Sequence, residues 1–72
     1  MTLDQVQANR EVTIVKIGGE KAVRRRLMDL GLLPKTTILV TKTAPLGDPM
    51  EIKVRNTDLT IRKKDAQNIT VI

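Results

Sequence analysis

The chain has no aromatic residue, no histidine and no cysteine among its 72 residues. Without aromatic side chains it lacks the stacking platform of most single-strand nucleic-acid binders and the lining of grooves that hold Pro-rich peptides. Without His and Cys, zinc and other soft metals lose their usual ligands, and a nucleophilic Thr or Lys has no histidine as its base. The composition therefore predicts no catalytic residue, no metal site and no cofactor, and it argues against an enzyme.

The absence of cysteine also removes any disulfide as a source of stability. A chain of 72 residues has room for one hydrophobic core, and it buries only about 60% of the surface that its unfolded form exposes. We expect a single domain over residues 1–72 with a marginal core.

Positive charge is in excess, with 13 Lys and Arg against 8 Asp and Glu and a formal net charge of +5. Such a chain attracts acidic partners, whether protein, nucleic acid or a membrane surface. The start, Met1 to Gln5, lacks the basic and apolar regions of a signal peptide, and no apolar run approaches the roughly 18 residues that span a bilayer. We expect a cytoplasmic soluble domain that does not insert into a membrane.

One stretch, residues 20–30, has the periodicity of an α-helix. Val23, Leu27 and Leu30 lie at i, i+4 and i+7 and form one apolar stripe. Gly31 stands where a C-terminal cap needs a positive φ, and Pro34 prevents continuation. On the solvent side, i, i+4 ion pairs are available between Glu20 and Arg24 and between Arg25 and Asp29.

Five short β-branched or alternating runs predict strands, at residues 12–17, 37–44, 50–55, 59–62 and 69–72. Met50, Ile52 and Val54 are expected to point inward. Residues 56–58 are expected to form a turn, and residues 2–6 and 63–68 to form single helical turns. Five short strands with one inserted helix suit a small, strongly bent sheet that closes into a barrel.

Residues 43–52 combine two prolines with a glycine and an aspartate, which predicts an antiparallel hairpin. Leu46 is unusual because its aliphatic side chain stands where loop tips are normally polar. It either folds back over the end of the barrel or contacts a partner.

Three segments resemble one known family. Residues 26–34, RLMDLGLLP, are similar to the "RLxxLGLxPG" signature of ferrous iron transport protein A (FeoA). Residues 44–52, APLGDPMEI, resemble its "APLGDPIEI" segment, and residues 64–71, KDAQNITV, resemble its "xxEAxxIxV" ending. The segments occur in the family's order and extend over most of the chain.

The resemblance implies an SH3-like barrel with its helix between the first and second strands. It implies an accessory role beside FeoB, a membrane ferrous iron transporter with a cytosolic GTP-hydrolysing domain. The family as a whole is associated with transition-metal ions, yet the lack of His and Cys argues against this chain as an iron carrier. The structural motif positions that carry over are Leu27, Leu30, Gly31, Pro34, Pro45 and Pro49.

Two positions depart from the family pattern. Lys35 stands where the family has Gly, so that turn either avoids a positive φ or tolerates strain. Residues 9–11, Asn-Arg-Glu, stand where a Pro-Gly pair is usual, and Asn9 can adopt the left-handed conformation.

We predict that two groups of residues contact the transporter: Leu46, Gly47 and Asp48 in the loop, and Arg24, Arg25 and Arg26 on the helix. The simpler interpretation of the arginines is a solvated helix face. An arginine finger acting on the partner's GTPase domain is a further alternative with weak support. We expect a monomer, or weak self-association, recruited to the inner face of the membrane by its partner.

The main alternative function is a small basic SH3-like nucleic-acid-binding protein, with affinity from phosphate contacts. Acidic residues interrupt the basic ones and stacking residues are absent, so we expect no nucleic-acid partner. A second alternative is a domain appended to an iron-dependent repressor. Because Met1 precedes the first element closely, we expect a free-standing protein instead.

Overall fold

The computed structural model describes residues 1–43 and 48–72. The predictions made for Pro45, Leu46 and Gly47 therefore lie outside the described residues. In chain order the elements are η1 (Leu3–Gln5), β1 (Arg10–Ile17), α1 (Lys21–Asp29), β2 (Thr37–Thr43), β3 (Met50–Val54), β4 (Thr57–Ile61), α2 (Lys63–Ala66) and β5 (Ile69–Val71).

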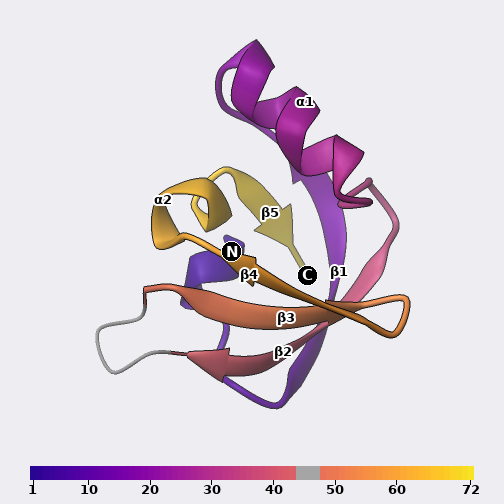
Figure 1. Ribbon diagram of the computed structural model, residues 1–72, viewed down its shortest axis with the longest axis vertical. Coiled ribbons are helices and arrows are strands. Elements are labelled where there is room, and N and C mark those ends of the chain that lie inside the picture. Colours follow the sequence, from indigo (N-terminus) through magenta and orange to yellow (C-terminus); the bar gives the residue numbers. More distant parts are fainter. Residues whose placement is uncertain (44–47) are drawn as a thin grey trace.

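The five strands form one antiparallel sheet in the order β4-β3-β2-β1-β5, with α1 inserted between β1 and β2. Figure 1 shows the sheet wrapping around its own concave face, with α1 over one end. The mainly β fold of the sequence analysis is confirmed. Strands β4 and β5 remain the two edges of the sheet, so hydrogen bonds do not close the barrel completely.

The core is aliphatic throughout. Met50, Ile52 and Val54 are 1%, 0% and 3% exposed, which confirms the predicted inward face of β3. In the described part of the chain no polar or charged side chain is buried. The other fully enclosed large side chains come from every layer of the fold, namely Leu3, Ile14, Leu27, Leu32, Ile38, Ile69, Val40 and Val71.

The turn between β3 and β4 lies earlier than the sequence analysis placed it. Arg55 and Asn56 form a two-residue turn with φ angles of 51° and 66°, whereas Thr57 and Asp58 belong to β4. Positive φ at both central residues is the geometry that matches the twist of a tight hairpin. The prediction of a turn at residues 56–58 was wrong because Arg55 carries no sequence signal for a positive φ.

Helix α1 lies within the predicted range, and Gly31 has the expected positive φ, at 93°. Leu27 is fully buried and Val23 packs against the core, but Leu30 is 47% exposed. The predicted apolar stripe therefore leaves the core at its last residue. This happens because the helix ends at Asp29 and Leu30 belongs to the cap, where the chain turns away.

Neither predicted ion pair along α1 forms among the described residues. The two ion pairs found there are Arg26–Asp65 and Lys53–Asp58. In an exposed i, i+4 pair, the gain in Coulomb energy is small in water and does not force two long side chains together.

Besides Arg55 and Asn56, two further non-glycine residues of the described chain adopt the left-handed conformation. Asn9 has a φ of 69°, as predicted. Lys35 has a φ of 73°, so of the two alternatives for this position the strained one holds. Its backbone N–H donates to the carbonyl of Ile14 at 2.7 Å, which ties the turn to β1.

The N-terminal segment covers one edge of the sheet. Thr2 forms an antiparallel bridge with Thr70, and the N–H of Val71 donates to the carbonyl of Met1 at 2.8 Å. The outer edge of β5 is thus paired within the chain, while β4 lies at the opposite edge.

None of the helices in the described residues is long and apolar enough to cross a membrane.

Candidate functional site

Asp48 is the described residue of the predicted loop contact, and its side chain has a partner within the chain. Its Oδ1 atom accepts a hydrogen bond from the backbone N–H of Lys63 at 3.0 Å. Lys63 is the first residue of α2, whose initial N–H groups have no partner within the helix. Asp48, which directly precedes Pro49 and β3, is therefore hydrogen-bonded to the first residue of α2. Leu46 and Gly47, the other two members of the predicted contact, lie outside the described residues.

The three arginines of α1 differ in their surroundings. All three are exposed, but the guanidinium of Arg26 turns toward α2 and pairs with Asp65, with Nη2 3.0 Å from Oδ2. Arg24 and Arg25 lie on the outer side of the helix, where a shallow depression also includes Lys21 and Met28. Arg26 also lines a depression with Lys21, Arg25 and Asp29, so it lies between the outer face of the helix and α2.

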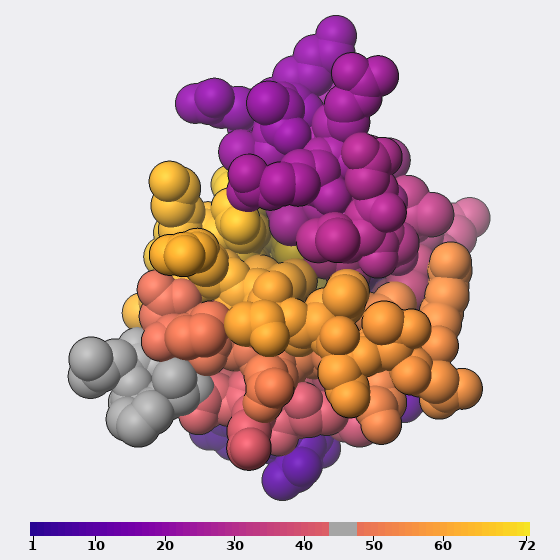
Figure 2. Space-filling view, viewed as in Figure 1, coloured from indigo at the N-terminus to yellow at the C-terminus, as the bar shows by residue number. Residues whose placement is uncertain are grey.

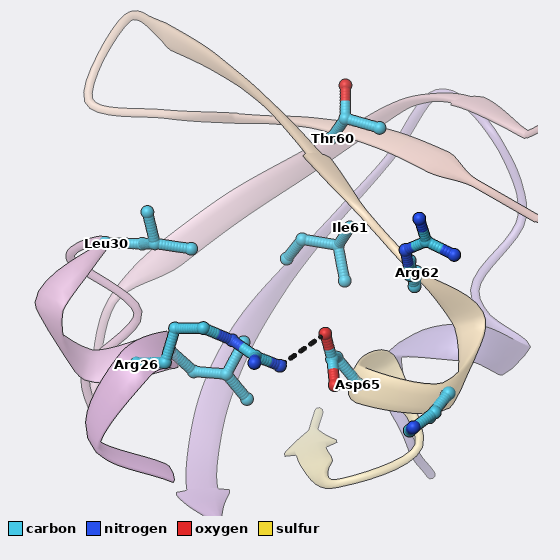
Figure 3. Close-up of a pocket in the computed structure, with 8 residues that line it drawn as sticks. Arg26, Leu30, Thr60, Ile61, Arg62 and Asp65 are labelled. Atoms are coloured by element: carbon cyan, nitrogen blue, oxygen red, sulfur yellow. Dashed lines mark hydrogen bonds and ion pairs between the residues drawn. The ribbon is translucent and has the colours of Figure 1, made fainter. Parts of the chain in front are cut away.

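Arg26 belongs to a cleft of about 490 Å³ between α1, β4 and α2. Figure 3 shows Arg26 and Leu30 extending from α1 toward Ile61 and Asp65 on the other side. In the space-filling view the molecule is hollowed at this place, between the magenta helix and the orange strand (Figure 2). The lining residues are Arg26, Leu27, Leu30, Thr60, Ile61, Arg62, Lys64 and Asp65.

The cleft has a basic rim over an aliphatic floor. Arg26, Arg62 and Lys64 supply three cations and Asp65 supplies the single carboxylate; because Asp65 pairs with Arg26, the cations left over are Arg62 and Lys64. Leu30 offers an aliphatic side chain that is 47% exposed, beside the buried Leu27 and Ile61. Such a surface can hold an acidic group and an apolar group at the same time.

This cleft was not predicted from the sequence. Leu30 was predicted to be a structural residue, and no functional role was predicted for Thr60, Arg62 or Lys64. The two walls come from residues 26–30 and 60–65, about 30 positions apart in the chain. A single sequence has no periodicity that brings such distant segments together, so only the fold reveals the site.

Ligands for a metal ion do not gather in the described part of the chain, where no three His, Cys, Asp or Glu side chains converge. The chain contains neither His nor Cys, and carboxylates alone suit hard cations such as magnesium or calcium. The absence of a metal site therefore stays a prediction.

Comparison with known proteins gives one consistent result. The sequence model of the FeoA domain matches residues 1–72. A curated protein of Porphyromonas gingivalis, an Fe(2+) transport protein A/Fe(2+) transporter FeoB fusion protein, is 30% identical over 71 residues. That match covers 99% of this chain but only 8% of the fusion protein.

Solved structures agree with the sequence match. The solution structure of FeoA from Chlorobium tepidum is 42% identical, with a TM-score of 0.89, and the match covers 99% of this chain and 68% of that one. FeoA from Stenotrophomonas maltophilia, described as a procaryotic SH3 domain protein, shares the fold at 22% identity and a TM-score of 0.88, over 100% of this chain and 89% of that one. The resemblance drawn from the three sequence segments is confirmed, and the chain belongs to the FeoA family.

Proposed function

We propose that this chain is a non-catalytic accessory domain of ferrous iron uptake, which acts in the cytoplasm by binding a FeoB-type membrane transporter. The observation that carries the proposal is the relative in which an FeoA segment and an FeoB transporter form one polypeptide. Fusion keeps two domains at a high effective concentration, which favours a pair that works in contact. The same contact is proposed for this chain.

The outer face of α1 is the surface that we assign to the first encounter with the transporter. Lys21, Arg24 and Arg25 lie together there, and the helix stands out from the body of the molecule (Figure 2). Charge on an exposed, protruding element guides an acidic partner during diffusion. The loop residues Leu46, Gly47 and Asp48 are the second proposed contact, although Asp48 also has its structural bond to Lys63.

A binding role fits the chemistry of the described residues better than catalysis does. Their polar and charged side chains are all at least partly exposed, whereas catalytic groups usually depend on burial to shift their proton affinity. The cleft beside α1 offers cations and aliphatic surface but no nucleophile with an adjacent base. These are features of a recognition surface.

The proposal is tested by a pull-down with the full-length transporter in detergent. Wild-type protein is compared with the double variant Arg24→Glu/Arg25→Glu and with the control Arg10→Glu/Lys42→Glu, which reverses two other exposed charges. Each double variant lowers the formal charge from +5 to +1, since each reversal removes two units. We expect the α1 variant to bind at least tenfold more weakly, while the control retains most of its affinity.

Two outcomes would contradict different parts of the proposal. If the wild-type chain fails to bind the transporter, the proposed function is wrong. If both double variants weaken binding equally, only net charge matters and α1 is not the contact. For the loop, unchanged affinity and stability in Leu46→Ser would remove Leu46 from the interface.

Assembly of the transporter and modulation of its GTPase are separable roles. The rate of GTP hydrolysis by the transporter, measured with and without saturating amounts of this chain, distinguishes them. An unchanged rate assigns the role to assembly. A rise that disappears in one single arginine variant of α1 would instead identify an arginine acting on the transition state.

A further inference from the structure

The two edges of the sheet differ in how they are protected. The outer edge of β5 pairs with the N-terminal segment through Met1 and Thr2. Strand β4 pairs with β3 along its inner side, and no described residue donates or accepts a backbone hydrogen bond on its outer side. An edge with unpaired N–H and C=O groups is a template for another strand.

The hairpin turn determines which groups of β4 face outward. In a hairpin with a two-residue turn, the flanking residues, here Val54 and Thr57, exchange both backbone hydrogen bonds. Hydrogen-bonded pairs then recur at every second residue as far as Ile61. The N–H and C=O groups of Asp58 and Thr60 therefore point away from β3. Thr60 also lines the cleft.

The cleft places side-chain recognition beside this open edge. Arg62 follows β4 directly, Lys64 lies in α2, and Arg26 and Leu30 face β4 from α1 (Figure 3). Side chains of an extended segment alternate between its two faces, so a strand added at Thr60 would present alternate residues to the basic rim and to Leu30. Peptide-binding domains that add a strand use this combination of backbone pairing and side-chain pockets.

We infer that the cleft between α1 and β4 binds an extended acidic segment of the partner protein, which adds to the sheet at Thr60. The occupant is acidic because two cations of the lining, Arg62 and Lys64, form no ion pair among the described residues, whereas Arg26 is paired with Asp65, the one carboxylate of the cleft. It also carries an aliphatic residue that covers Leu30. The inference rests on the proposed function, since it identifies the part of the transporter that this chain recognises.

A second copy of this chain is the competing occupant of the edge. It would bring another formal charge of +5 to a basic cleft, so like charges oppose this pairing. Nucleic acid and lipid headgroups offer anionic groups, but they have no N–H and C=O ladder to pair with Thr60.

Thr60→Pro tests the backbone contact directly. Proline removes the outward N–H of residue 60 and leaves the hydrogen bonds between β3 and β4 in place, a position where edge strands accept proline. Thr60→Val is the matched control because it keeps the N–H and a β-branched side chain. Binding to the full-length transporter in detergent is expected to weaken at least tenfold in Thr60→Pro and less than twofold in Thr60→Val.

The double variant Leu30→Ser/Arg62→Glu keeps the inference testable if proline disturbs the fold. Both residues are exposed, so the variant is expected to fold while it binds at least tenfold more weakly. Hydrogen exchange of the wild-type chain gives an independent measurement. The amides of Asp58 and Thr60, which point away from β3, should exchange more slowly in the complex than in the free chain.

The outcomes separate this inference from the proposed function. Wild-type binding with no added protection at Asp58 and Thr60 and full affinity in both cleft variants overturns the inference and leaves the proposed function standing. Protection of these amides in the free chain at rising concentration, without transporter, assigns the edge to a second copy and also overturns it. Absence of any binding by the wild-type chain overturns both.

Discussion

Asp48 shows how one side chain can serve the fold and still belong to a recognition motif. Its carboxylate accepts a hydrogen bond from the N–H of Lys63 across the end of the hairpin loop. Aspartate is among the residues best suited to satisfy the free N–H groups at the start of a helix. The contact that Asp48 makes in this structure is therefore a structural one.

Replacement of Asp48 by Ala is expected to lower the free energy of unfolding by about 0.5–1.5 kcal/mol, within the range for loss of a side chain that caps a helix and below its upper end because this hydrogen bond is exposed. For a domain of this size that corresponds to a fall in Tm of about 2–12 °C. Asp48→Asn is the control, because its amide oxygen keeps an acceptor for Lys63. Urea denaturation of the three proteins measures the effect, and equal stability of Asp48→Ala and wild type would refute the capping role.

The backbone conformation of Lys35 could not be predicted from the sequence. The sequence shows a lysine where the family pattern has glycine, which leaves the backbone conformation open. The structure keeps the glycine-like geometry, with a φ of 73°, because the N–H of Lys35 is fixed by its bond to the carbonyl of Ile14. A tertiary hydrogen bond overrides the local preference, and no property of the lysine itself reveals this.

Helix α1 is attached to the sheet by a small number of side chains. Leu27 is its one fully buried residue, Val23 packs partly against the core, and Leu30 remains 47% exposed. The first of these, Leu27, therefore holds the helix against the sheet. The last, Leu30, is free to contact a partner.

The pair Leu27→Ala and Leu30→Ala separates these two roles. Loss of a buried leucine side chain costs about 2–5 kcal/mol, a large part of the stability of a small domain. We expect Leu27→Ala to unfold at markedly lower urea concentration, and Leu30→Ala to stay within about 1 kcal/mol of wild type while its binding to the transporter weakens. Similar losses of stability in both variants would show that Leu30 belongs to the core.

At the level of helices and strands, the sequence predicts a strand correctly where apolar and polar residues alternate. It does not predict a turn or a cleft whose geometry depends on contacts between distant residues. The alternation of Met50, Ile52 and Val54 predicts β3 correctly, because burial on one face selects apolar residues at every second position. The β3–β4 turn was misplaced because Arg55 adopts a positive φ that its residue type does not indicate. The cleft was missed because its walls meet only after the sheet has curved.

The whole molecule combines a long-range charge with a short-range binding surface. Its formal charge of +5 includes several cations on α1 and around the cleft. The proposed backbone contact at Thr60 depends instead on hydrogen bonds between two chains. These two contributions act at different stages of association, since steering changes the rate of encounter and buried contacts change the rate of dissociation.

Salt should therefore affect the two rate constants differently. The Debye length falls from about 30 Å at 0.01 M salt to about 8 Å at 0.15 M, so attraction of an acidic partner is lost over most of the approach. We expect the association rate constant with the detergent-solubilised transporter to fall roughly tenfold or more over this range, with a much smaller change in the dissociation rate constant.

Two variants should change different rate constants. Thr60→Pro should associate with the same salt dependence as the wild type but dissociate faster. Arg24→Glu/Arg25→Glu should associate more slowly than the wild type at low salt. Surface plasmon resonance at several salt concentrations resolves the two rates. Salt-independent association of the wild-type chain would show that its positive charge does not steer it to this partner.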